Sequence, residues 1–447
     1  MRLWTLKLKT KRMKHSIRTL TLGCSKNRVD TEHLVSQLGD DFQVIEENET
    51  NKPVDYLLIN TCGFIGDAKQ ESIDAILDSV EQKRRGEIGQ ILVFGCLSER
   101  YKTEMPELIP EVDAWFGARD IEPILKYLGV KPDHSLMKYR KPTECGPGTA
   151  YLKISEGCDR RCSYCAIPHI RGAHKSVPME ELVEEAKVLA SRGVKELILI
   201  AQDTTYYGLD LYHHRALAEL IEKLSAIPEI KWIRIHYSYP DDFPEDVLAQ
   251  MANNPKVCKY LDIPLQHISD VVLSKMRRHV DSKWTRELVA RLREEVSGVV
   301  LRTTMIVGHP GEGDKEFEEL LEFCRQARFE RLGAFKYSEE EGTYGALHYK
   351  DEVSEDIKQQ RYDALMEQQS EISYEYNTSR IGNELEVIVD DYADGKLICR
   401  SQYESPEVDG EIIVSVPKGV DAEKLLGNFI KVKVVAADLY DLVAEMI

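Results

Sequence analysis

Three apolar, β-branched runs open the chain, and a polar stretch with apolar residues at helical spacing follows each of them. The runs IRTLTLGC, DYLLINTC and QILVFGC end at Cys24, Cys62 and Cys96. Apolar residues three and four positions apart lie on one face of a helix, so VDTEHLVSQLG and ESIDAILDSVEQKRR are typical of helices between strands. This alternation predicts a parallel sheet, and we expect a doubly wound α/β domain over residues 16–135.

A second alternating series follows a segment rich in Pro and Gly, residues 136–148, which we interpret as a linker. Its strands read TAYLKISE, ELILIAQD, WIRIHYSY, YLDIPLQH, VLRTTMIVG and RLGAFKYS. Six βα units are too few for a closed eightfold barrel. The pattern therefore predicts an open, partial (βα)6 barrel within a domain at 149–376, which ends in a polar helix near 352–376.

The pattern changes again over residues 377–447, where short strands are broken by Gly, Asp and Pro. Such a pattern predicts a small antiparallel β-barrel. With 447 residues, the chain is long enough for three separately cored domains. Residues 1–15 are basic but lack the apolar core of a secretory signal, and we interpret them as a tail.

Composition and charge bear on the compartment and the binding partner of the protein. The ten cysteines are typical of metal ligands or reduced thiols, because a disulfide framework belongs to secreted chains. This cysteine usage, in a chain without a secretory signal, predicts a cytoplasmic location. No apolar run is long enough to span a bilayer, so we expect no membrane. The net charge of −18 bears on the choice of partner, because an acidic surface attracts a basic protein whereas nucleic-acid binding needs Lys and Arg on the binding face; net charge alone does not decide between the two.

The candidate chemistry begins in the loop GCDRRCSYCAIPHIRG, which carries Cys158, Cys162 and Cys165. Three thiolates satisfy three of the four irons of a cuboidal 4Fe-4S cluster and leave the fourth open. A zinc site completed by His169 or His174 is the alternative. The loop follows a strand of a βα barrel, at the end where active sites gather, and this favours the cluster.

Cys24, Cys62 and Cys96 form a second candidate set. Each ends a predicted parallel strand, and the carboxyl ends of such strands open onto one crevice, so these thiols can converge on a second cluster. Buried apolar thiols at strand ends are the alternative. We interpret the remaining cysteines as structural, namely Cys145, Cys258, Cys324 and Cys399.

The first loop resembles the radical S-adenosylmethionine (SAM) superfamily, whose Cys-x3-Cys-x-aromatic-Cys signature it matches with Tyr164 as the aromatic residue. The resemblance implies that the open iron chelates SAM and that one electron cleaves it to a 5′-deoxyadenosyl radical. It also implies that Tyr164 lies near the adenine, that Gln202 and Asp203 meet the methionine end, and that Gly308 in IVGHPGE lines the nucleoside. A packing or turn role is the alternative for these last assignments.

Nearly the whole chain is similar to the methylthiotransferases, through LGCSKNRVDTEHL, NTCGFI, FGCLSERY, DIPLQHISD and a tail that resembles a TRAM domain. The resemblance implies a second 4Fe-4S cluster on Cys24, Cys62 and Cys96. It also implies that a C–H bond becomes C–S–CH3, with one SAM as radical source and another as methyl donor. An electron donor such as flavodoxin or ferredoxin and a sulfur source are then needed.

Two branches of that family remain, one acting on an N6-modified adenosine in transfer RNA and one on the β-carbon of an aspartate in the small-subunit ribosomal protein S-twelve. Three segments resemble the second branch: Ser25-Lys26-Asn27, AQDTTYYG and SQYESPEVDG. From Thr378 onward the tail has seven basic and fourteen acidic residues, which suits a basic protein. The remaining hypotheses are redox-sensing or structural clusters beside an RNA-binding tail, and a radical enzyme of another reaction type.

Overall fold

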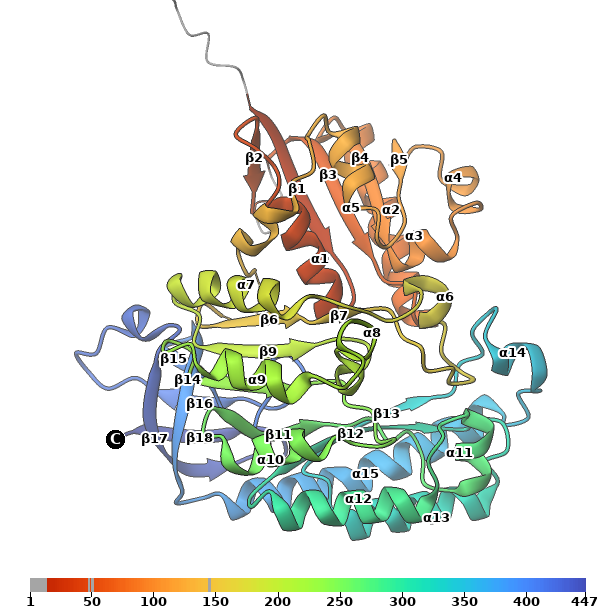
Figure 1. Cartoon of the computed structure of the whole chain (residues 1–447), viewed down its shortest axis with the longest axis vertical. Helices are drawn as coiled ribbons and strands as arrows, with labels where there is room; N and C mark the ends of the chain where they lie inside the picture. Colours follow the sequence, from red (N-terminus) through yellow and green to blue (C-terminus); the bar gives the residue numbers. More distant parts are fainter. Residues whose placement is uncertain (1–13, 47–48, 50–51, 144–145) are drawn as a thin grey trace, which may run out of the picture. The chain divides into compact units, whose positions relative to one another are not determined.

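The computed structural model describes residues 14–46, 49, 52–143 and 146–447, and it divides into two compact units, one up to Arg140 and one from Lys141 onward. Most of the basic tail and Cys145 lie outside the described residues. Figure 1 shows the helices and strands of both units. No helix of the described residues is long and apolar enough to cross a membrane.

The first unit is a five-stranded parallel sheet with the strand order β2-β1-β3-β4-β5. Its strands are β1 (His15–Thr21), β2 (Phe42–Ile45), β3 (Val54–Thr61), β4 (Ile88–Gly95) and β5 (Ala114–Trp115). Its helices are α1 (Ser25–Val35), α2 (Gly66–Arg84), α3 (Cys96–Arg100), α4 (Met105–Leu108), α5 (Ile121–Tyr127) and the 3-10 helix η1 (His134–Tyr139). The edge strands β2 and β5 are additions to the three predicted ones, since both are short and carry no long apolar run.

Alternate residues of the central strands point to opposite faces of this sheet. Leu57 and Ile59 pack with Ile76 of α2, whereas Leu58 packs with Leu34 of α1 and Ile124 of α5. Helices therefore cover both faces, and the predicted doubly wound fold is confirmed. The order 2-1-3-4-5 places a topological switch point between β1 and β3.

The second unit contains six parallel strands in sequence order, as predicted for an open partial barrel. They are β6 (Thr149–Lys153), β9 (Glu196–Ile200), β10 (Trp232–Ile235), β11 (Val257–Asp262), β12 (Val300–Val307) and β13 (Arg331–Lys336). A short hairpin, β7 (Ser155–Glu156) with β8 (Lys175–Ser176), flanks the cysteine loop.

Helices lie between and after these strands (Figure 1), and α7, α9, α10, α12, α13 and α15 contribute buried residues to the apolar core of the barrel. They are α6 (Ile167–Arg171), α7 (Met179–Ser191), η2 (Thr204–Tyr206), α8 (Leu209–Tyr212), α9 (Leu217–Ser225), α10 (Glu245–Asn253), α11 (Asp270–Met276), α12 (Ser282–Glu295), α13 (Asp314–Ala327), α14 (Tyr344–His348) and α15 (Glu355–Ser379). The long polar helix expected near 352–376 is α15.

The tail is a closed five-stranded barrel of order β14-β15-β16-β18-β17. Its elements are β14 (Glu384–Ala393), β15 (Lys396–Ser401), β16 (Ile412–Ser415), η3 (Ala422–Leu425), β17 (Phe429–Ala437) and β18 (Leu442–Met446). All strand pairs are antiparallel except β16 with β18, which is parallel. The predicted small β-barrel is confirmed, and we call it the terminal barrel. The predicted division into three domains stays a prediction, since both barrels belong to one unit.

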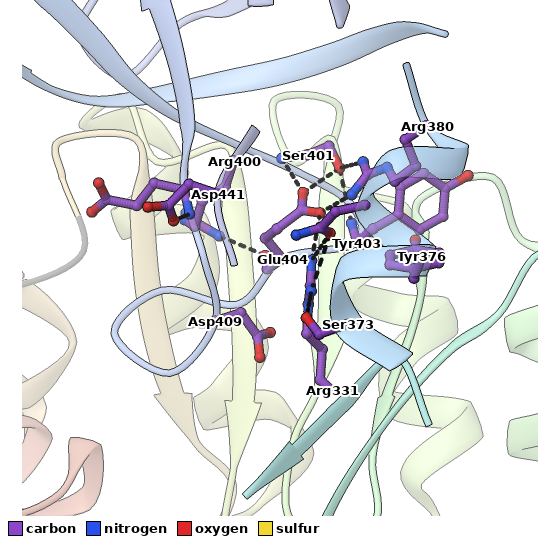
Figure 2. A network of polar contacts seen from close by, with 12 residues as sticks. Arg331, Ser373, Tyr376, Arg380, Arg400, Ser401, Tyr403, Glu404, Asp409 and Asp441 are labelled. Carbon is purple, nitrogen blue, oxygen red and sulfur yellow. Dashed lines mark hydrogen bonds and ion pairs between the residues drawn. The ribbon is translucent and has the colours of Figure 1, made fainter. Parts of the chain in front are cut away.

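The segment SQYESPEVDG joins the terminal barrel to the (βα)6 barrel. Figure 2 shows Glu404 at the centre of this junction, where it is 1% exposed and pairs with Arg380 and, at 3.4 Å, with Arg331. Burial by itself raises the pKa of Glu404, but the two guanidinium groups outweigh it and lower the pKa to about 2. A second buried carboxylate, Glu196 on β9, accepts from Arg400 of β15 at 2.8 Å. Buried ion pairs therefore fix the two barrels to each other.

Candidate active site

The three cysteines of the first unit lie at the carboxyl ends of adjacent strands. Cys24 follows β1 and Cys62 follows β3, so these two flank the switch point, and Cys96 begins α3 directly after β4. Ligands of open α/β sheets bind at this place, because the chain diverges there and leaves a crevice. The topology alone thus brings the three segments to one edge of the sheet.

Glycines next to the cysteines allow these segments to touch. A Cβ atom on Gly23 would lie 2.6 Å from Cβ and 2.9 Å from Sγ of Cys62. A Cβ atom on Gly63 would lie 2.7 Å from the Leu97 nitrogen and 2.9 Å from the Cys96 carbonyl carbon. The side chain of Cys62 therefore lies against the backbone that precedes Cys24, and the residue after Cys62 contacts the backbone at Cys96.

Asn27 connects all three segments with one buried side chain. Its Nδ2 donates to the Leu22 oxygen at 2.9 Å and to the Thr61 oxygen at 3.2 Å, and its Oδ1 accepts from Cys96 Sγ at 3.8 Å. In the sequence, Asn27 stands out only as part of the Ser25-Lys26-Asn27 segment, and its contact with Cys96 was not predicted. Its position three residues after Cys24, on the first turn of α1, is the only signal that the sequence offers.

In the second unit, the loop between β7 and β8 carries the other three cysteines. The Cys158 nitrogen donates to the Gly172 oxygen at 3.0 Å, and the Cys165 nitrogen donates to the Cys162 oxygen at 3.1 Å. Between them, the Ser163 nitrogen donates to the Met276 oxygen at 2.9 Å, and the Ser163 oxygen accepts from the Gly345 nitrogen at 2.6 Å. The loop is thus held at Cys158 and at Ser163, and a turn within it orders the segment from Cys162 to Cys165.

Burial raises the pKa of the Cys158 thiol to about 12 and raises that of Cys165 as well. Both side chains are only partly exposed, so water does little to stabilise a thiolate there. A bound cation is needed to keep these groups deprotonated, since metal binding and thiol deprotonation are linked. This chemistry fits thiolate coordination of a metal centre.

The sets of cysteines do not form a site for a single ion. Among the residues that the structure describes, no three His, Cys, Asp or Glu side chains are gathered to hold one metal ion. Of the two histidines considered for zinc, His169 is exposed and His174 contacts Ser176 Oγ through Nε2 at 3.0 Å. A cuboidal cluster needs only that each thiolate reach a different iron, and three converging loop segments can meet that requirement.

Tyr164 packs in an apolar cluster with Val272, Met276, Ile306 and Tyr337. The predicted adenine neighbour and the predicted nucleoside strand therefore lie side by side. Gly308 at the end of that strand has a φ of +77°, and a Cβ atom there would lie 2.3 Å from Cγ of Lys358 on α15. This glycine lets α15 approach the strand closely, which is the packing role considered above.

Gln202 and Asp203 follow the same strand but make different contacts. Gln202 Nε2 donates to Glu156 Oε1 at 2.8 Å, while its Oε1 is buried and has no hydrogen-bond partner among the described residues. Asp203 accepts from Arg160 of the cysteine loop at 2.9 Å through Oδ2 and from Thr205 Oγ1 at 2.6 Å through Oδ1. Asp203 thus anchors the loop, and Gln202 presents an acceptor without a partner.

Two further residues, Arg278 and Tyr239, contact Cys162 and were missed by sequence analysis. Arg278 Nη1 donates to Cys162 Sγ at 3.8 Å, and Tyr239 Oη lies 3.8 Å from the same sulfur. Both come from segments far from the cysteine loop, so no spacing in the sequence points to them.

Comparison with known proteins agrees with this geometry. The model of the radical SAM superfamily matches residues 152–324, that of the uncharacterized protein family UPF0004 matches residues 16–117, and that of the TRAM domain matches residues 381–447. The solved structure of the radical SAM methyltransferase TsrM from Kitasatospora setae aligns with a TM-score of 0.53 at 13% identity, over 72% of each chain. The open barrel and its cysteine loop thus define a radical SAM protein.

Full-length relatives narrow the class. The protein named ribosomal protein uS12 methylthiotransferase RimO from Phocaeicola vulgatus is 48% identical to this chain, over 97% of this chain and 100% of that one. Those from Porphyromonas gingivalis share 46%, over 97% and 99%, and that from Christiangramia forsetii shares 47%, over 98% and 96%. The chain belongs to the RimO family, and the predicted membership of the methylthiotransferases is confirmed.

Proposed function

We propose that this protein is a radical SAM methylthiotransferase that places a methylthio group on the β-carbon of an aspartate in ribosomal protein uS12. The observation that carries the proposal is the pair of three-cysteine sites, one at the strand ends of each unit, in a chain whose full-length relatives are named for this reaction. The other described cysteines, Cys258, Cys324 and Cys399, are buried in apolar cores and serve neither site.

Cys158, Cys162 and Cys165 would hold one 4Fe-4S cluster, and Cys24, Cys62 and Cys96 would hold the other. When bound, the first would supply the electron that cleaves SAM, and the second would present the sulfur that is transferred. The free Oε1 of Gln202 is suited to accept from the ammonium group of SAM, since a buried acceptor without a partner is costly. Tyr164 and the strand before Gly308 are suited to contact the adenosine.

The charge on the surface of the terminal barrel favours a basic protein as substrate over transfer RNA. Its exposed acidic residues are Glu384, Glu386, Asp391, Asp394, Glu407, Glu411, Asp421, Glu423, Asp438 and Glu445. Its exposed basic residues are Lys396, Lys418, Lys424, Lys431 and Lys433, because both of its arginines are buried. A surface that binds phosphates needs more basic than acidic residues. A ribosomal protein that binds RNA is itself positively charged, and an acidic surface attracts it.

The proposal also requires a one-electron donor such as flavodoxin or ferredoxin, a sulfur source and a cytoplasmic setting. Within it, residues 16–135 form the methylthiotransferase domain, 149–376 the radical SAM domain and 377–447 the TRAM domain.

The test is mass spectrometry of uS12 and of bulk transfer RNA from cells that lack this chain. We expect the methylthio mass on the uS12 aspartate to disappear and transfer RNA to remain unchanged. If methylthio-adenosine disappears from transfer RNA while the mass of uS12 stays the same, the protein acts on transfer RNA and the proposal is wrong.

A second test separates the two cysteine sets in the reconstituted protein. Changing Cys24, Cys62 and Cys96 to alanine should leave 5′-deoxyadenosine formation intact and abolish sulfur transfer, whereas Cys158→Ala should abolish both. Cys324→Ala is the matched control, because this thiol is buried in the core of the barrel. Full product formation by the triple variant would contradict the proposal.

A further inference from the structure

Two guanidinium groups contact the ring of Tyr239, in the loop after β10. Cζ of Arg160 lies 4.0 Å from the ring centroid, and Cζ of Arg278 lies 4.2 Å from it. Arg160 belongs to the cysteine loop, between Cys158 and Cys162, and Arg278 follows α11. At these distances the cations are attracted to the aromatic face, and the attraction grows where water is excluded.

The two arginines differ in how their charge is balanced. Arg160 pairs with Asp203 at 2.9 Å and with Asp241 at 2.8 Å, so nearby carboxylates neutralise it. Arg278 is 3% exposed and forms no ion pair with a carboxylate among the described residues. A buried cation without a counterion is strongly unfavourable. An anion must therefore be present beside Arg278 in the working protein.

The contacts of Arg278 show where that anion lies. Its Nη2 donates to the Pro264 oxygen at 2.5 Å, and the Tyr239 hydroxyl donates to its carbonyl oxygen at 2.7 Å. The first bond holds the guanidinium group and the second holds the backbone of Arg278, and Nη1 lies 3.8 Å from Cys162 Sγ and 3.4 Å from Tyr164 Oη. Of the groups that it touches, the sulfur of Cys162 is the one that becomes an anion on binding iron.

We propose that Arg278 is a positioning residue that places a fixed positive charge on the Cys162 thiolate and thereby raises the reduction potential of the SAM-cleaving cluster. The inference rests on the proposed function, since it assumes a cluster on Cys158, Cys162 and Cys165. Reduction by an external one-electron donor adds one negative charge to the cluster, and a nearby cation stabilises that state. Hydrogen bonds to cluster sulfurs and net charge are recognised determinants of such potentials.

The test compares Arg278→Gln with Arg277→Gln in the background that lacks Cys24, Cys62 and Cys96, so that one cluster remains to be titrated. Arg277 is the matched control, because it is the adjacent arginine and its guanidinium contacts the Tyr344 ring at 4.3 Å, with no contact to a cysteine in the described structure. The readout is a redox titration followed by electron paramagnetic resonance, together with the iron content.

We expect Arg278→Gln to shift the ratio of oxidised to reduced cluster at least tenfold toward the oxidised form, which corresponds to about 59 mV for one electron. Arg277→Gln should shift it less than about twofold. Arg278→Lys, which keeps the charge, should recover most of the loss. A merely structural role would lower the amount of bound iron and leave the potential of the loaded fraction unchanged.

Equal potentials for the Arg278→Gln and Arg277→Gln proteins, both loaded with iron, would overturn the inference. If Arg278→Gln binds no iron, Arg278→Met is titrated in its place, because methionine keeps an unbranched side chain without the charge, and the same two outcomes apply. Absence of any cluster from the parent background would instead defeat the proposed function, so the two failures are distinguishable.

Discussion

Replacement of Glu404 by glutamine tests whether the terminal barrel is held by buried charge. Glutamine keeps the size of the side chain and removes the negative charge, which leaves Arg380 and Arg331 buried with less compensation. The pKa of Glu404 lies at about 2 in the folded chain, against 4.5 for an unperturbed glutamate. At about 1.4 kcal/mol per pKa unit, the ionised form contributes about 3 kcal/mol to folding. This agrees with the 3–5 kcal/mol that breaking a buried pair typically costs, roughly.

The assay is urea unfolding followed by circular dichroism at pH 7, with Glu423→Gln as control, because Glu423 is an exposed carboxylate in the same barrel. We expect a loss of about 3 kcal/mol for Glu404→Gln and less than about 0.5 kcal/mol for the control. A carboxylate with a lowered pKa stabilises the fold above its unfolded pKa. The difference between native protein and variant should therefore shrink as the pH falls from about 4.5 toward 2. Equal midpoints for the two variants at pH 7 would refute the reasoning.

Three further predictions concern the sites. Asn27→Ala removes the hydrogen bonds that join the three cysteine segments of the first unit. We therefore expect chemical analysis to show a loss of about half of the iron, while 5′-deoxyadenosine formation persists. An unchanged iron content would contradict this. Gly95→Ala should cost several kcal/mol, roughly, by urea unfolding, because its Cβ would lie 2.4 Å from Asn60 Oδ1 at a φ of +103°. Gly86→Ala, at +78° with nothing within 4 Å, should cost about 1 kcal/mol, and equal losses would exclude the steric explanation. Burial holds the pKa of His309 at about 4, below its ordinary 6.5, so native stability is lost as the pH falls from about 6.5 toward 4. Between about pH 7 and 5, the free energy of unfolding should therefore fall by about 2 kcal/mol less in the His309→Asn protein than in the native protein, as measured by urea unfolding. The control is His348→Asn, which replaces an exposed histidine and should follow the native protein.

The sequence determined the elements and their classes, because hydrophobic spacing reports how each segment is buried. The six barrel strands, the three long strands of the first sheet and the small terminal barrel all follow from that spacing. The cysteine loop was also visible, since its three thiols lie within eight residues. For Cys24, Cys62 and Cys96, the rule that parallel strands end at one edge was sufficient to predict that their segments meet.

Only the tertiary structure decided which distant side chains support these cysteines. Asn27, Tyr239 and Arg278 act through contacts between segments far apart in the chain, and no local period encodes such contacts. The same holds for SQYESPEVDG, which the sequence suggested as a mark of the substrate and which the fold uses to bury Glu404 against Arg331 and Arg380. The physical reason is that the pairing of buried charges depends on which strands become neighbours, and that is settled when the chain packs.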